Sequence, residues 1–185
     1  GFMLLAMGSG VVDGNTVSAG NAYSSAMFYM ITYVLTTLGS FGLIMLLARD
    51  GFESEEIADW AGLAKRRPWM AGVMSVFMFS LAGIPPTMGF YAKLAVLQAL
   101  ITTDHTGYLI LAIVAVLLSL VAAFYYLRVV KVMYFDEPTQ TELTQDFGMP
   151  GALMMINGAA VLVLGLLPGG LMAVCRDAIV RALAT

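Results

Sequence analysis

"SLAGIPPTMGFYAKLAVL", residues 80–97, decides how this sequence folds, because it places two consecutive prolines and a lysine inside a long apolar segment. Each proline lacks a backbone N–H, and its ring clashes with the preceding helical turn. The residue before a proline is also pushed out of the helical region. We therefore predict a helix broken between Gly83 and Pro86, at Pro85 and Pro86. Its first half should end near Ala82 and its second half should begin near Pro86 or Thr87.

The composition around this stretch is that of a membrane protein. Hydrophobic residues make up 60% of the 185-residue chain, charged residues make up 11%, and the mean hydropathy is +0.87. A soluble domain carries about 25% charged residues. Residues 15–48 and 147–175 carry no charge, and residues 68–127 carry only Lys93 and Asp104. Such runs indicate transmembrane helices, so the predicted fold is an all-α polytopic membrane protein.

We predict four transmembrane helices and the tail of a fifth. The tail is residues 1–7, which start apolar without an initiator Met or a basic leader, so we expect the chain to be a fragment of a longer protein. A glycine-rich turn is predicted at residues 8–16. After the fourth span, residues 171–185 are predicted to form an interfacial helix with Leu171, Val174, Cys175 and Val180 on one side. The four spans are expected at about 19–48, 69–101, 108–135 and 151–167.

The most polar segment, residues 49–68, predicts an amphipathic surface helix near 54–66. Apolar residues recur there at helical spacing, at Ile57, Trp60, Ala61 and Ala64. Basic residues set the orientation, because positive charge accumulates in cytoplasmic loops. One side holds six of them, the other only Arg176 and Arg181. This asymmetry places the polar loop in the cytoplasm and the C-terminus in the periplasm, with Tyr125, Tyr126 and Tyr134 in an interfacial belt at the cytoplasmic side. The six are Arg49, Lys65, Arg66, Arg67, Arg128 and Lys131.

Several functions are disfavoured by what the sequence contains. One cysteine, Cys175, excludes an intrachain disulfide and a CxxC metal site. The net charge of −3 and the lack of a basic patch argue against a nucleic-acid partner. The sequence shows no nucleophile–base pair, phosphate-binding glycine loop, haem ligand or iron–sulfur ligand set. We therefore predict no metal, no cofactor in this chain and no catalysis by the chain alone.

Lys93 is the candidate functional residue. It lies about 12 Å along the helix from its end near Ile101, too far for its side chain to reach the surface easily. A charge at the bilayer centre costs at least about 2.5–3.5 kcal/mol, so such residues usually face water or protein within a bundle. Broken helices at this depth build ion sites in transporters. Lys93 is therefore predicted to carry protons; a snorkelling lysine and a structural charge paired with a distant acid are the alternatives.

Other polar residues carry weaker predictions. Six hydroxyl residues are candidates for lining a water chain, although hydroxyls in membrane helices often bond only to the backbone: Thr36, Thr37, Ser75, Ser80, Thr87 and Tyr91. His105 is a candidate proton exit in the loop after the broken helix, with a solvated loop histidine as the alternative. Asp104 beside it is read as a solvated loop residue.

Four segments together resemble the antiporter-like subunits of respiratory complex I, the bacterial NADH–quinone oxidoreductase. They are "MSVFMFSLAGIPPTMGFYAKLAVL" at 74–97, "YVLTTLGSFG" at 33–42, "IADWAGLAKRRP" at 57–68 and "YYLRVVKVMYF" at 125–135. The resemblance covers nearly the whole chain. It implies that residues 1–185 are the C-terminal part of an antiporter-like domain with two inverted repeats, each holding a broken helix. Lys93 then matches the lysine assigned to proton transfer toward the periplasm, whereas the first repeat's charged residues lie upstream.

The resemblance implies a multi-pass subunit of the bacterial inner membrane that couples quinone reduction to proton translocation. Its partners would be the lipid bilayer and the other membrane-arm subunits, and ubiquinone would be met only through the complex. Electron transfer would occur elsewhere, so the subunit would be a non-catalytic part of a translocase. The alternative is a subunit of a multisubunit cation/proton antiporter, which shares this fold. A third reading is a structural subunit that holds the membrane arm together.

Overall fold

A computed structural model describes residues 1–12, 16–48, 56–103, 105–138 and 148–183, and the regular elements among them are helices. Among these residues, three helices are long and apolar enough to cross a membrane, at Ser18–Ala48, Thr106–Phe135 and Gly148–Leu166. The all-helical membrane architecture is therefore confirmed, and the spans expected at 19–48, 108–135 and 151–167 agree with these bounds within a few residues. The helices are α1 (Phe2–Val12), α2 (Thr16–Ala48), α3 (Leu63–Arg66), α4 (Pro68–Ala82), α5 (Met88–Ile101), α6 (Thr106–Phe135), α7 (Gly148–Leu166) and α8 (Pro168–Leu183), with a 3₁₀ turn, η1, at Ile57–Trp60.

The expected 69–101 span consists of two short apolar helices, α4 and α5. Helix α4 ends at Ala82, and Gly83 follows in the left-handed conformation, with φ of 84° and its N–H bonded to the carbonyls of Phe79 and Ser80. Helix α5 begins at Met88 after Thr87 in extended conformation. A glycine thus closes α4, and the Pro85–Pro86 pair (a cis peptide) lies in the connection between α4 and α5.

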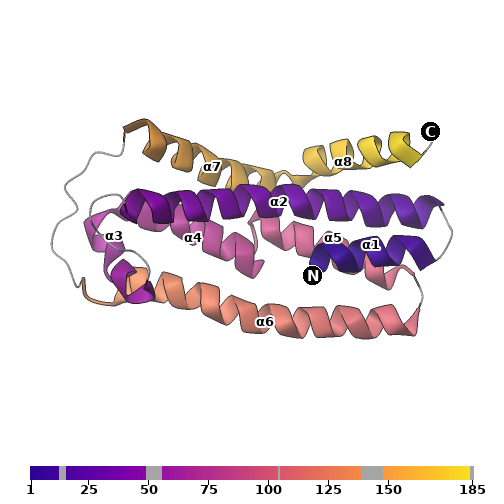
Figure 1. The fold of residues 1–185 in the computed structure, drawn as a ribbon, viewed down its shortest axis with the longest axis horizontal. Coiled ribbons are helices and arrows are strands. Elements are labelled where there is room, and N and C mark those ends of the chain that lie inside the picture. Colours follow the sequence, from indigo (N-terminus) through magenta and orange to yellow (C-terminus); the bar gives the residue numbers. More distant parts are fainter. Residues whose placement is uncertain (13–15, 49–55, 104, 139–147, 184–185) are drawn as a thin grey trace.

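Helix α2 forms the axis of the bundle (Figure 1). Helices α7 and α8 follow one another along one side of α2, and α6 runs along the other side, with α4 and α5 between them. Buried side chains from α2, α4, α5 and α7 form the main core, which includes Phe28, Phe77, Met88 and Val161. This packing holds the connection between α4 and α5 inside the bundle.

Helix α1 is longer than the sequence predicted. Residues 8–12, expected to be part of a turn, continue the helix to Val12; residues 13–15 lie outside the described part. The glycine at position 10 allows a close approach to α2, since a Cβ there would lie 3.1 Å from the Cβ of Ala22. Packing against α2 therefore outweighs the low helix propensity of glycine here.

The predicted amphipathic surface helix near 54–66 is wrong in its described part, residues 56–66. The chain forms η1 and α3, separated by Gly62 at φ of 64°. The N–H of Gly62 bonds to the carbonyl of Val132 in α6 at 3.3 Å, and a Cβ at Gly62 would clash with Pro138. Trp60 is buried while Ile57 is exposed. The segment thus packs on the end of α6, and this contact sets its bend.

Helix α8 also differs from the prediction. It packs along the N-terminal half of α2, with Cys175 fully buried, whereas Val174 and Val180 are exposed. The predicted apolar side is therefore only partly right. The break at Leu167–Pro168 lets α8 follow α7 along α2 (Figure 1).

Candidate functional site

Lys93 lies in the second turn of α5, and its ammonium reaches back to the end of α4. Its Nζ donates hydrogen bonds to the carbonyl oxygens of Leu81 and Ala82, both at 2.9 Å. These carbonyls belong to the last turn of α4, where the helix itself supplies no donors and the helix dipole favours a cation. Lys93 therefore caps the helix that the prolines interrupt.

Gly83 is needed at this point for two reasons. Its φ of +84° is a conformation that other L residues rarely adopt. A Cβ on Gly83 would also lie 2.9 Å from Cδ and 3.2 Å from Nζ of Lys93. A larger residue would therefore both strain the backbone and displace the ammonium.

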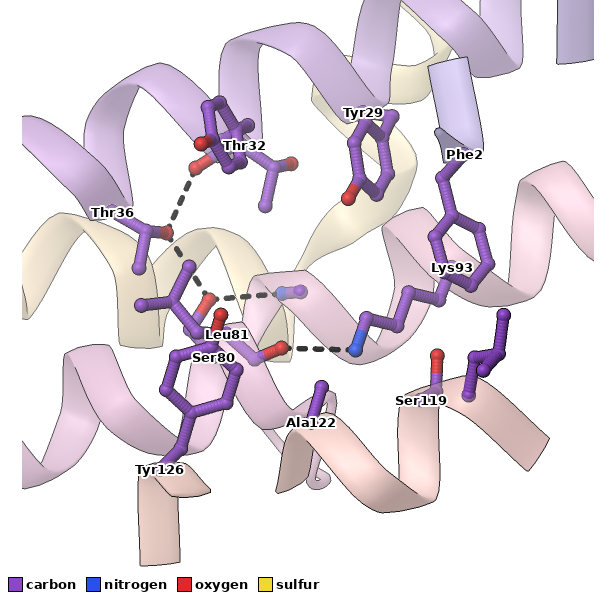
Figure 2. Close-up of a pocket in the computed structure, with 13 residues that line it drawn as sticks. Phe2, Tyr29, Thr32, Thr36, Ser80, Leu81, Lys93, Ser119, Ala122 and Tyr126 are labelled. Atoms are coloured by element: carbon purple, nitrogen blue, oxygen red, sulfur yellow. Dashed lines mark hydrogen bonds between the residues drawn. The ribbon is translucent and has the colours of Figure 1, made fainter. Parts of the chain in front are cut away.

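A cavity of about 210 Å³ lies beside Lys93, between α2, α4, α5 and α6. Figure 2 shows the lysine side chain extending toward the end of α4, with aromatic and hydroxyl side chains around the cavity. The ring of Phe2 lies 5.7 Å from Nζ and stacks on Tyr29 at 5.6 Å between ring centroids. The polar residues lining the cavity are Tyr29, Thr32, Tyr33, Thr36, Ser80, Ser119 and Tyr126.

Hydroxyl groups connect three helices at one wall of this cavity. The hydroxyl of Thr36 lies 3.2 Å from that of Ser80, and the N–H of Gly89 donates to Ser80 Oγ at 3.2 Å. Thr36 Oγ1 lies 2.8 Å from the carbonyl of Thr32. Across the cavity, Ser119 Oγ is buried without a hydrogen-bond partner. Because a hydroxyl can both donate and accept, these groups are able to bind water or relay a proton.

Lys93 has no carboxylate partner among the described residues. The ion pairs found there join Lys65 to Glu137 and Lys131 to Asp136, on exposed side chains at the α3 end of the bundle. The charge on Lys93 is stabilised by the two carbonyls and by the face of Phe2. The structural alternative, a lysine paired with a distant acid, finds no support in the described part of the chain.

Of the predicted water-chain residues, Thr36 and Ser80 line the cavity and the others do not. Thr87 is buried, and its hydroxyl donates to the carbonyl of Ile84 at 2.7 Å, within the connection itself. Tyr91 is half-buried and packs edge-on against Phe90. His105 is exposed just before α6 and packs edge-on against Tyr108. Asp104 lies outside the described residues.

Tyr29 and Tyr126 are two of the cavity residues that the sequence analysis did not predict; Thr32, Tyr33 and Ser119 are the other polar ones. Tyr126 was expected in an interfacial belt, but it lines the cavity, while its neighbours Tyr125 and Tyr134 are exposed. The available signal was spacing: Ser119, Ala122 and Tyr126 recur at i, i+3 and i+7, the period of one helix face.

These features define a class of membrane protein. The chain belongs to the NADH:quinone oxidoreductase/Mrp antiporter transmembrane family, which matches residues 1–120. Within that class, the chain is 58% identical over its whole length to NADH-quinone oxidoreductase subunit N of Herminiimonas arsenicoxydans. It is 56% identical over 97% of its length to subunit N of Polaromonas naphthalenivorans. The resemblance to antiporter-like complex I subunits is thereby confirmed, and both of these relatives are named subunit N.

The chain spans 37% of the length of the first of these relatives and 36% of the second. Among solved structures, it resembles a chain of respiratory complex I from Thermus thermophilus with bound aureothin, with a TM-score of 0.69 and 28% identity. That match covers 93% of this chain and 36% of the other. A chain of the Mrp complex from Dietzia sp. also has a TM-score of 0.69, at 20% identity over 86% of this chain and 38% of the other, and shows the shared fold.

Proposed function

We propose that this chain is the C-terminal part of a proton-translocating membrane subunit of a respiratory NADH–quinone oxidoreductase. The similarity to subunit N over the whole chain supports this assignment. The chain itself holds no cofactor in this proposal: electron transfer and quinone reduction occur in other subunits, and residues 1–185 form part of the antiporter-like domain. Its partners are the other membrane-arm subunits and the bilayer.

The observation that carries the proposal is the position of Lys93. A cation without a carboxylate partner in the described residues sits at a helix interruption and opens onto a hydroxyl-lined cavity. A lysine amine can both bind and release a proton, which a proton-transfer group requires. Once Lys93 gives up its proton, its neutral amine keeps two N–H donors but loses the charge that strengthens the hydrogen bonds to the carbonyls of Leu81 and Ala82. Proton release therefore favours the entry of water or a shift of the lysine side chain.

The proposal treats α4 and α5 as one crossing of the bilayer, the fourth beside the three long helices. The helices have 15 and 14 residues, or about 22 Å and about 21 Å at 1.5 Å per residue. Each is shorter than the hydrocarbon core of about 30 Å, and together they exceed it. The connection at residues 83–87 then lies near mid-membrane, where freed backbone groups must face protein or water.

We further propose a cytoplasmic α3 end and a periplasmic C-terminus in the bacterial inner membrane. The described basic residues Lys65, Arg66 and Arg67 lie in or next to α3, and Arg128 and Lys131 lie in the last turns of α6, which packs against α3. The C-terminus of α8 lies at the opposite end of the bundle (Figure 1). Positive charge at one end supports this orientation.

Purification of the full-length protein with its natural partners tests the assignment. We expect an assembly that oxidises NADH, reduces quinone and takes up protons when reconstituted in vesicles. The second candidate function, a multisubunit cation/proton antiporter, is favoured by the same family match and by the shared fold. An assembly that exchanges sodium for protons without quinone reduction would replace the first proposal with the second.

The role of Lys93 is tested by Lys93→Ala in the full-length subunit. After assembly has been confirmed, we expect proton uptake to fall more than the amount of assembled complex does, because the protonatable group is gone. Lys131→Ala, an exposed lysine at the α3 end of the bundle, is the control. Full proton uptake by the Lys93→Ala complex would make the broken helix a scaffold.

A further inference from the structure

Helix α7 touches the connection between α4 and α5 at a glycine. Gly165 is buried, and a Cβ added there would clash with the carbonyl oxygen of Pro86 and lie 2.5 Å from the backbone nitrogen of Met88. The carbonyl carbon of Thr87 would lie 2.7 Å away. These are backbone atoms, which cannot rotate aside as the end of a side chain can. The connection therefore lies directly against the backbone of α7.

The last turn of α4 lies equally close to the next residue of α5. A Cβ at Gly89 would clash with the carbonyl oxygen of Ser80 and lie 2.7 Å from its carbonyl carbon. The N–H of Gly89 also donates to Ser80 Oγ at 3.2 Å. Because Gly89 directly follows Met88, the first turn of α5 meets the backbone of α7 at one residue and the backbone of α4 at the next. Such close packing means that a shift of one neighbour is passed to the other.

The hydrogen bonds inside the connection are local. Pro85 and Pro86 have no backbone N–H, and both residues are exposed. The N–H and the hydroxyl of Thr87 both bond to the carbonyl of Ile84, at 3.1 Å and 2.7 Å. These bonds shape a turn, but they do not fix its position relative to α7. The contact with Gly165 supplies that restraint.

Lys93 lies one helical turn beyond this closely packed start of α5. It follows Gly89 by four residues, so the two lie on one face of the helix, and both line the hydroxyl-lined cavity. The ammonium bonds to the carbonyl oxygens of Leu81 and Ala82, the two residues that follow Ser80. A displacement of the start of α5 relative to α4 therefore changes the distances from the ammonium to these carbonyls.

We propose that Gly165 is a positioning residue for Lys93. By lying against the connection, it lets α7 hold the start of α5 against α4, which keeps the ammonium within hydrogen-bond distance of the two carbonyls. Gly165 acts through the backbone of residues 86–89. This inference rests on the proposed function, because the position of Lys93 matters for proton transfer only if Lys93 carries protons.

A second glycine of α7 provides a matched control. Gly158 is also buried and precedes Gly165 by seven residues, which places it on the same face of α7. A Cβ there would lie 2.9 Å from Cγ1 of Val73, a side-chain atom in the first half of α4. Of the two glycines, Gly165 alone lies against the connection. Gly158→Ala therefore disturbs the packing of α7 without displacing the start of α5.

A double-mutant cycle in the full-length subunit, assembled in its complex, tests the proposal. The melting temperature of the detergent-solubilised complex is measured for the wild type, Lys93→Ala, Gly165→Ala and the combined variant. Independent residues give additive effects, whereas coupled residues do not. We expect Lys93→Ala to change the melting temperature less in the Gly165→Ala background, because Gly165→Ala has already moved the ammonium away from the carbonyls. In the Gly158→Ala background, Lys93→Ala should cause the same change as in the wild type.

Proton uptake per assembled and reconstituted complex is the second readout. It should fall in Gly165→Ala and stay near the wild-type value in Gly158→Ala, because a purely structural defect reduces the amount of complex and not the activity of each complex. If Gly165→Ala does not assemble, Val161→Ala takes its place in the cycle. Val161 lies one turn before Gly165, is fully buried and belongs to the same cluster as Met88. Its truncation loosens α7 without a clash and should show the same coupling to Lys93, to a smaller extent.

Two results would overturn the inference. Additive changes in melting temperature would show that Gly165 serves only the packing of α7. Equal proton uptake per complex in Gly165→Ala and Gly158→Ala would show that the contact with the connection does not affect Lys93. The proposed function fails separately, through full proton uptake by Lys93→Ala, and that result leaves the coupling in melting temperature unchanged.

Discussion

Lys93 combines a structural contact with the proton-transfer role that we propose for it. Its ammonium completes the last turn of α4 through the carbonyls of Leu81 and Ala82, and it is the one lysine that faces the hydroxyl-lined cavity. The first role is structural and needs only a positive charge with hydrogen-bond donors. The second needs a group that can lose its proton. Substitutions that keep one property and remove the other separate the two roles.

Gly83→Ala should destabilise the subunit. The positive φ of Gly83 costs other L residues roughly 1–2 kcal/mol, and the new methyl group would press on the Lys93 side chain. Thermal unfolding of the detergent-solubilised protein measures the effect. Gly72→Ala, where a Cβ meets nothing within 4 Å, is the control and should be neutral or stabilising. Equal melting temperatures for the two variants would contradict the assigned role of Gly83.

The sequence was sufficient to select Lys93 as a candidate residue but not to predict the groups around it. A lysine and a proline pair in an apolar segment are local signals, and both retain their meaning in the structure. Tyr29 and Tyr126 come together with Lys93 only because α2 and α6 pack on either side of α5. The partners of Lys93, two backbone carbonyls, carry no sequence signal at all.

At the scale of elements, two helix breaks determine how the helices pack against one another. Helix α4 gives way to α5, and α7 gives way to α8, at breaks that contact each other through Gly165. The ends of α4 and α5 were predictable, because prolines and glycines act on their immediate neighbours. The course of η1, α3 and α8 was not, since packing on α6 or α2 selects it and helical periodicity alone contains no information about those contacts.

Ser80→Ala tests the link between helices at the interruption. The hydroxyl of Ser80 accepts from the N–H of Gly89 in α5 and lies beside Thr36 of α2. Its loss leaves a buried backbone donor unsatisfied, at about 1–3 kcal/mol. Ser119→Ala removes a hydroxyl that has no partner and should cost less. The melting temperatures of the two variants give the comparison, and an equal or larger loss for Ser119→Ala would argue against the link.

At the scale of the whole molecule, charge and polarity are distributed unequally along the bundle. Exposed ion pairs and basic residues gather at the α3 end of the bundle. A polar cleft between α2, α5 and α8 opens near the other end, where α2 begins and α5 ends. Composition predicted the membrane location of this bundle, because long uncharged runs are a global property. It did not predict that α7 and α8 would share the length of α2, which the structure shows (Figure 1).

The orientation yields its own prediction. Lys131→Cys and His105→Cys place thiols at exposed positions near the two ends of α6. In vesicles of known sidedness, an impermeant thiol reagent should reach Lys131→Cys from the cytoplasmic side and His105→Cys from the periplasmic side. Reaction of both from one side would contradict a membrane-spanning α6, and the reverse pattern would invert the proposed orientation.

The proposed role of Lys93 in proton transfer is tested by comparing Lys93→Arg with Lys93→Ala in the assembled, reconstituted complex, with quinone reduction, proton uptake and thermal stability recorded together. Arginine keeps a positive charge and donors for the carbonyls of Leu81 and Ala82 but does not release its proton in proteins. If Lys93 carries protons, Lys93→Arg will retain more of the wild-type stability than Lys93→Ala does, and both variants will lose proton uptake. If Lys93→Arg restores proton uptake as well as stability, Lys93 only caps α4, and the account given for it is wrong.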